Sequence, residues 1–136
     1  MPTITINCPP LPAPRRRAAA LRITRWLGDH GVRTAHAVVR FEETAENTVF
    51  SGGMPLEALP HRGTGLRHAS VICCVGVDRE EGFRAGLAHC VADALGVDDD
   101  TSFFYLEFRP TPRTDVVLGA GGRLRRADGA ELPRPV

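Results

Sequence analysis

The sequence predicts an α/β (α+β) fold in which two tandem β-α-β units form a four-stranded sheet with two helices on one face. The length of 136 residues fits one compact domain, residues 1–136, better than two independent ones. The order strand, helix, strand, hairpin occurs twice, and equivalent strand residues such as Phe41 and Phe108 are 67 positions apart. Each crossover should be right-handed, because parallel strands joined through a helix are almost always connected in that hand.

The first unit is expected to span residues 1–53 and to open with a strand and a helix. The run Thr3-Ile4-Thr5-Ile6-Asn7-Cys8 is rich in β-branched residues, and the two prolines that follow it cannot continue a central strand. Between Arg15 and Leu27 apolar residues recur at helical spacing, and Gly28 supplies a stop.

A second strand and a hairpin complete the first unit. The segment from Ala37 to Glu43 has the apolar content of a strand, and Val49-Phe50 before Gly52-Gly53 predicts a hairpin. Residues 54–68 are rich in glycine, proline, histidine and arginine and show no apolar period. They are therefore expected to be a linker.

The second unit is expected to span residues 69–122 and to repeat this order. Its expected elements are a strand from Ser70 to Val77, a helix from Glu80 to Leu95, a strand from Phe103 to Phe108 and a hairpin from Val116 to Gly122. Residues 123–136 are expected to form a flexible tail or an arm that pairs with a sheet edge.

The composition argues against nucleic-acid and membrane partners. The 17 basic residues, all of them arginines, balance 16 acidic ones, so the chain has little long-range attraction for phosphate. No apolar run reaches the roughly 18 residues of a membrane span, and no secretion signal opens the sequence. The four cysteines show no C-x-x-C pair and are expected to be small buried hydrophobes, with a reducing cytoplasm as the default location.

The two-layer arrangement leaves one face of the sheet without a helical cover. The alternate strand residues would line this face and leave it exposed in a monomer. An apolar sheet face of this size rarely stays in water, so the sequence predicts an oligomer.

Pro2 is the first candidate for chemistry. The chain begins Met-Pro, and methionine before a small residue such as proline is normally removed, which leaves Pro2 with a free secondary amine. A terminal amine has a pKa of about 7.7 to 8.0, close enough to neutrality to accept or donate a proton. If Met1 is retained, the nitrogen of Pro2 is an amide that cannot act as a base, and the chain is then a non-catalytic binding or assembly module.

The combination of Met-Pro, an immediate strand and a duplicated β-α-β unit resembles the tautomerase superfamily. This superfamily includes 4-oxalocrotonate tautomerase, cis-3-chloroacrylic acid dehalogenase and malonate semialdehyde decarboxylase. The segment from Val39 to Gly53, which ends in Val-Phe-Ser-Gly-Gly, is similar to the strand and hairpin of the dehalogenase group. The resemblance covers about residues 1–122 and implies that Pro2 is the catalytic acid or base, that no cofactor takes part and that the fused units assemble as a homotrimer.

The resemblance also assigns roles to other residues. Arg79, just past the second unit's first strand, matches the family's arginine that holds the substrate carboxylate, a task that suits a guanidinium fork. Tyr105 falls where the dehalogenase group has an active-site tyrosine, and Asp115 lies close to that group's water-activating carboxylate. Phe50, in the first hairpin, is a candidate wall of the proline pocket. A structural role alone would also explain each of these four residues: Arg79 opens a helix, Tyr105 lies in a strand, and Asp115 and Phe50 lie in hairpins.

The sequence departs from the dehalogenase pattern at two places. That group's helix histidine has no counterpart near Trp26, and Gly82 stands where the resemblance expects a second arginine. Efficient dehalogenation is therefore not expected.

The leading functional hypothesis is a cofactor-independent tautomerase, in which Arg79 holds a small 2-oxo or enol carboxylate and Pro2 moves a proton. The first alternative is a hydratase or weak dehalogenase of 3-substituted unsaturated acids, in which Pro2 is the acid and Asp115 and Tyr105 activate water. The second alternative is a non-catalytic trimeric binding module. No metal is expected, because the histidines show no ligand spacing with carboxylates or thiols.

Overall fold

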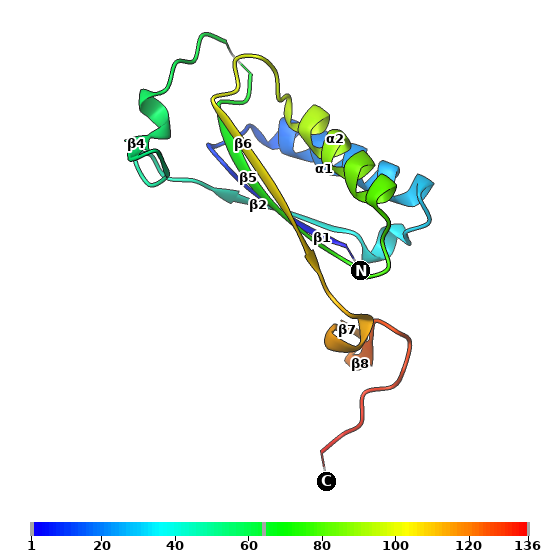
Figure 1. Ribbon diagram of the computed structural model, residues 1–136. Coiled ribbons are helices and arrows are strands. Elements are labelled where there is room, and N and C mark those ends of the chain that lie inside the picture. The colour runs from blue at the N-terminus through cyan, green and yellow to red at the C-terminus, as the bar shows by residue number, and fades with distance from the viewer. Residues whose placement is uncertain (1, 64, 136) are drawn as a thin grey trace.

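Two helices lie against one face of a four-stranded sheet (Figure 1). The computed structural model describes residues 2–63 and 65–135. In chain order the sheet strands and helices are β1 (Thr3–Cys8), α1 (Ala13–Asp29), β2 (Val38–Glu43), β5 (His68–Val75), α2 (Glu81–Leu95) and β6 (Phe103–Pro110). This arrangement confirms the predicted fold class.

The sheet has the strand order β2-β1-β5-β6. The outer pairs β1–β2 and β5–β6 are parallel, as each β-α-β unit requires, and the central pair β1–β5 is antiparallel. Each unit also forms the same hydrogen bond at equivalent positions. The amide of Thr44 donates to the carbonyl of Cys8, and the amide of Thr111 donates to the carbonyl of Val75, both at 2.8 Å.

The hydrophobic core lies between the helices and the sheet. Alternate residues of the two central strands, Ile4 and Ile6 of β1 and Val71 and Cys73 of β5, are completely buried against the helices. The helices contribute Ala19, Ile23, Leu27, Leu87, Val91 and Leu95. Burial of such side chains, worth about 1.5–3 kcal/mol each, is the main force that holds the two layers together.

The first strand of the second unit is shifted relative to the prediction. It was expected from Ser70 to Val77, but β5 begins at His68 and ends at Val75. The amide of Arg79 donates to the carbonyl of Gly76 at 3.2 Å and closes a turn there, which leaves Val77 61% exposed. The apolar character of Val77 extended the sequence pattern past the point where the chain turns.

The open sheet face is mixed in character and less apolar than expected, although Val38 and Tyr105 on its edge strands are 47% and 48% exposed. The residues of the two central strands that point away from the helices are Thr3, Thr5, Asn7, Ser70, Ile72 and Cys74. On the edge strands this face carries two ion pairs, Arg40–Glu42 at 3.2 Å and Arg109–Glu107 at 3.3 Å. Threonine favours strands because it is β-branched, without supplying an apolar surface. Cys74 lies on this face and is only half-buried, whereas the other three cysteines are buried as expected.

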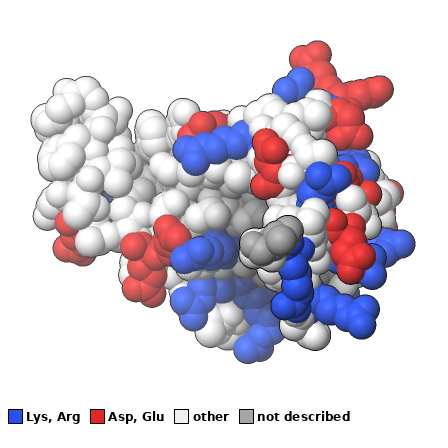
Figure 2. Space-filling view, turned by 90° about the horizontal axis from the view of Figure 1, so that it is seen from below, with Lys and Arg blue, Asp and Glu red and all other residues white. Residues whose placement is uncertain are grey.

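Two hairpins extend from opposite ends of the sheet (Figure 1). The first consists of β3 (Phe50–Ser51) and β4 (Met54–Pro55), and the second of β7 (Val117–Ala120) and β8 (Arg123–Arg126). Residues 47–56 around the first hairpin carry no charge, and Figure 2 shows them as an uncharged lobe at the left. Residues 123–136 were expected to form a tail or an arm, and their first four residues form the strand β8, which pairs with β7.

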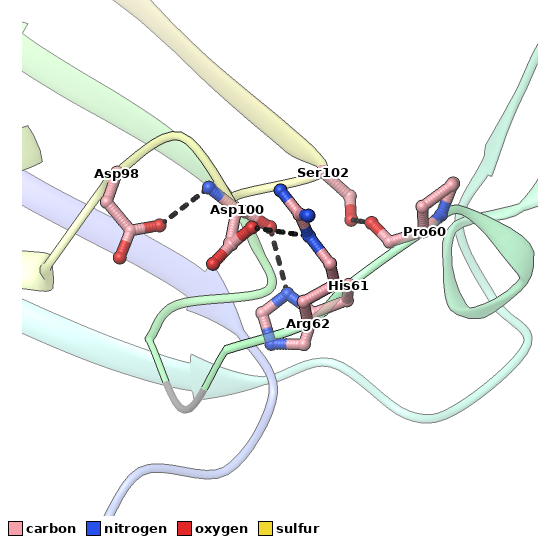
Figure 3. A network of polar contacts seen from close by, with 6 residues as sticks. All are labelled: Pro60, His61, Arg62, Asp98, Asp100 and Ser102. Carbon is pink, nitrogen blue, oxygen red and sulfur yellow. Dashed lines mark hydrogen bonds and ion pairs between the residues drawn. The ribbon is translucent and has the colours of Figure 1, made fainter.

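The linker is fastened to the loop between α2 and β6 (Figure 3). The imidazole Nδ1 of His61 lies 2.9 Å from the carbonyl oxygen of Asp100, and the hydroxyl of Ser102 donates to the carbonyl of Pro60 at 3.0 Å. Arg62 lies 3.5 Å from the carboxylate of Asp100. These contacts fix the path along which the chain returns from the first hairpin to β5.

A buried polar cluster lies where the linker enters β5. His68 is only 3% exposed and lies beside Arg67 and beside Glu57 of η2 (Leu56–Ala58). Arg67 donates a hydrogen bond from Nη2 to the carbonyl of Glu57, but Glu57 Oε1 and Arg67 Nε are buried without a hydrogen-bond partner among the described residues. Burial is the main cause that lowers the pKa of His68; Glu57 opposes this shift and Arg67 adds to it.

His68 is expected to make the fold less stable in mild acid. Because its pKa is lower in the folded chain than its ordinary value of about 6.5, the unfolded chain takes up the proton first as the pH falls. The stabilisation is therefore complete above a pH of about 6.5 and is lost as the pH falls toward the folded pKa. His68→Gln should reduce the difference between the free energies of urea unfolding measured on the two sides of this range.

The matched control is His89→Gln on the exposed surface of α2, which should keep the full wild-type loss of stability. Glu57 does not interfere, because its pKa is lowered from 4.5, chiefly by backbone hydrogen bonds, and its stabilisation is lost only at more acidic pH. An equal pH dependence in wild type and His68→Gln would show that His68 is not the responsible group.

Candidate active site

Pro2 lies at the start of the central strand β1. It is buried, in step with Ile4 and Ile6, which face the helices. Its carbonyl accepts a hydrogen bond from the amide of Val38 at 3.2 Å, so the backbone of Pro2 is held at the beginning of the β1–β2 pair. Met1, which is expected to be removed, lies outside the described residues.

The antiparallel pairing of β1 with β5 brings the loop that carries Arg79 to the same end of the sheet. Thr3 pairs with Cys74, so β5 leaves the sheet at the level where β1 begins. Arg79 follows in the turn closed on Gly76, two residues before α2 starts at Glu81. The partial positive charge at the start of α2 is offset by Glu80 and Glu81, so the positive group offered to an anion here is the guanidinium of Arg79.

The guanidinium of Arg79 rests on an aromatic ring. Its Cζ atom lies 4.4 Å from the centroid of the Phe83 ring on α2, within the range of a cation–π contact. Arg79 forms no ion pair with any residue that the structure describes, so its charge is available to a ligand.

Asp115 also lies at this end of the sheet. β6 runs parallel to β5 and pairs Pro110 with Val75, so the chain beyond β6 continues past the start of β1. Asp115 is the last residue of η3 (Arg113–Asp115) and is exposed. Arg113 lies 3.8 Å from Asp78, and this ion pair ties η3 to the loop that carries Arg79.

Tyr105 and Phe50 lie at the other end of the molecule. The register places Tyr105 level with Ser70 and Asn7, about 13 Å along the strands from the level of Thr3. Phe50 follows β2 into the first hairpin, which Figure 1 shows at the end of the sheet away from the N terminus. Both side chains are largely exposed, at 48% for Tyr105 and 57% for Phe50. Within one chain, therefore, the structure gathers Pro2, Arg79 and Asp115 but not these two aromatic residues.

Sequence reasoning missed the partners of the gathered residues. Phe83 lies within the helix expected from Glu80 to Leu95 and was given no role of its own, although its position four residues after Arg79 was a usable signal. The Asp78–Arg113 ion pair joins two loops and has no local signal.

Neither a metal site nor a membrane span is found in the part of the chain that the structure describes. No group of three or more histidine, cysteine, aspartate or glutamate side chains could hold a metal ion there. Likewise, none of the described helices combines the length and the apolar character that crossing a membrane demands.

Comparison with solved structures identifies the fold. A native fused 4-OT matches with a TM-score of 0.69 and 17% sequence identity, over 93% of this chain and 96% of that one. The chain has the tautomerase-superfamily fold. A wild-type fused 4-OT described as a symmetric trimer matches this tautomerase fold with a TM-score of 0.68 and 18% identity, over 93% and 97% of the two chains.

A third structure with the tautomerase fold carries information about a ligand. It is Pt0534 inactivated by 2-oxo-3-pentynoate, which matches with a TM-score of 0.64 and 16% identity, over 93% of this chain and 97% of that one. No protein-family model matches the sequence, and no curated protein matches it either.

Proposed function

We propose that the chain is a cofactor-independent tautomerase that acts on a small 2-oxo or enol carboxylate, with Pro2 as the general acid and base. The observation that carries this proposal is the convergence of Pro2 and Arg79 at one end of the sheet through the antiparallel β1–β5 pair. The fold, shared with fused 4-OT over nearly the whole chain, supports it. The inactivation of Pt0534 by a 2-oxo acid supports the substrate class.

In the proposed reaction Arg79 binds the substrate carboxylate and Pro2 transfers the proton. The neutral amine of Pro2 takes the proton from the enol hydroxyl, electrons move through the conjugated system, and the protonated amine returns a proton to carbon. A terminal amine suits both steps because its pKa lies near the working pH.

A second candidate function is hydration or weak dehalogenation of 3-substituted unsaturated acids. It is favoured by the position of Asp115, which the Arg113–Asp78 ion pair holds near the Arg79 loop. Here protonated Pro2 is the acid, and the carboxylate of Asp115 takes a proton from the attacking water. The Tyr105 of the same chain lies too far away to help.

We also propose that the protein assembles as a homotrimer and that its active sites lie between subunits. Three of the similar fused 4-OT structures are described as trimers. The uncharged lobe of the first hairpin, with Phe50 and Met54 more than half exposed, is suited to contact a second copy. In such an assembly Phe50 and Tyr105 of one subunit line the active site around Pro2 of another. Light scattering tests this directly, with three chains of 14.7 kDa expected.

The proposed function is tested by giving the purified protein two kinds of substrate. Turnover of 2-hydroxymuconate or phenylenolpyruvate, followed by loss of the enol absorbance, is expected for the tautomerase. Release of halide from 3-haloacrylates would indicate the second function, and Asp115→Asn should abolish this release while the enols still react. If neither enol is converted faster than in buffer, the tautomerase proposal is wrong.

A further inference from the structure

Arg79 is one end of a row of stacked side chains that crosses from α2 to α1. Its guanidinium lies over Phe83, and the ring of Phe83 lies 5.3 Å from the indole of Trp26, centroid to centroid, at an angle of 58°. The indole in turn stacks on the imidazole of His30, with centroids 3.8 Å apart and planes inclined by 17°. The row therefore begins in the turn before α2, passes through Phe83 of α2 and Trp26 of α1, and ends at the residue that follows α1.

The far end of this row is held from several sides. The imidazole Nδ1 of His30 lies 2.7 Å from the carbonyl oxygen of Trp26, which fixes the ring that stacks on the indole. On the other side Gly86 leaves room for the indole, because a Cβ at that position would lie 2.7 Å from Cζ2 of Trp26. Trp26 thus lies close against α2, where it contacts Phe83.

We propose that Phe83 is a positioning residue that holds the guanidinium of Arg79 in the orientation that binds the substrate carboxylate, with Trp26 supporting Phe83 from α1. An arginine side chain has many rotamers, and a free one would lose this entropy on each binding event. The ring of Phe83 offers a flat, negatively polarised face over which the guanidinium already lies. This inference rests on the proposed role of Arg79 as the carboxylate anchor.

The pair Phe83→Leu and Phe83→Tyr tests the inference. Leucine keeps an apolar side chain but removes the ring, and a cation–π contact of usual strength corresponds to a rise in KM of about 2- to 30-fold. kcat should change much less, because Phe83 does not touch the reacting atoms. Tyrosine keeps the ring and should restore the wild-type KM.

Phe104→Leu on β6 is the matched control. Phe104 also packs against the core but lies next to Ala69, at the end of the sheet away from Pro2. Its replacement should lower the melting temperature without raising KM.

A second pair of variants tests whether Trp26 of α1 supports Phe83. Gly86→Ala forces Trp26 away from its place and should raise KM in the same direction as Phe83→Leu. Gly82→Ala makes the same change on the same helix, where the added Cβ would meet nothing within 4 Å and cannot displace Trp26, so its effect on KM should be much smaller than that of Gly86→Ala.

The results separate failure of this inference from failure of the proposed function. If Arg79→Ala raises KM but Phe83→Leu does not, the positioning role is wrong and the proposed function stands. If Phe83→Leu and Phe104→Leu raise KM equally, or if Phe83→Tyr fails to restore it, the effect is general destabilisation and the inference is overturned. If Arg79→Ala has no effect on KM, the proposed carboxylate anchor itself is wrong.

Discussion

Insertion of one alanine between Met1 and Pro2 is expected to lower kcat for the enol substrates by about 10²- to 10⁴-fold. After removal of the methionine, the new alanine becomes the first residue and the nitrogen of Pro2 becomes an amide. An amide nitrogen has no basic lone pair, so the proton transfer loses its acid and base although the ring of Pro2 remains. Pro2→Ala leaves a primary amine at the same place, so it should lose less turnover than the insertion does.

The insertion must be shown to leave the fold intact. Pro2 makes its backbone hydrogen bond to Val38 through the carbonyl, which the insertion does not alter. The melting temperature and the assembly state should therefore stay close to those of the wild type. Full activity in the inserted variant would exclude Pro2 as the acid and base.

Arg79→Ala is expected to lower kcat/KM for the same substrates by about 10²-fold, mainly through KM. A hydrogen bond to a charged group contributes roughly 1.5–3 kcal/mol, and a guanidinium offers two of them to one carboxylate. Arg79→Lys should recover only part of the loss, because an ammonium group is a point charge and cannot form the paired fork.

The control for Arg79 is an exposed arginine at a distance from the proposed site. Arg25 lies on the surface of α1 and forms no ion pair with any residue in the described ranges. Arg25→Ala removes the same charge and should leave KM and kcat unchanged. Equal kinetics for Arg79→Ala and wild type would mean that the carboxylate is bound elsewhere.

Most elements of the fold could be predicted because their signals are local. The β-branched run before Pro9 and the helical spacing between Arg15 and Leu27 both correspond to observed elements, β1 and α1. The elements of the second unit, including α2 and β6, could then be predicted because the order of elements repeats. The open face of the sheet was misjudged because the strand pattern reports propensity, and Thr3 and Thr5 supply propensity without an apolar surface.

The candidate site could be predicted only in part because it depends on the pairing of distant strands. Pro2 and Arg79 were both named from the sequence, but their proximity follows from the antiparallel β1–β5 pair, for which no single segment holds a signal. The same register separates Tyr105 from Pro2 within one chain. Residue types along a chain indicate which chemistry is available, whereas strand register decides which groups can take part together.

The mass of the intact protein, produced without a tag at its amino terminus, tests the central claim most directly. The proposed mechanism requires that Met1 be removed and that Pro2 carry no further group, so the measured mass should equal that of residues 2–136. A mass that still includes the methionine, or an acetyl group on Pro2, would contradict the mechanism because the nitrogen of Pro2 would then be an amide.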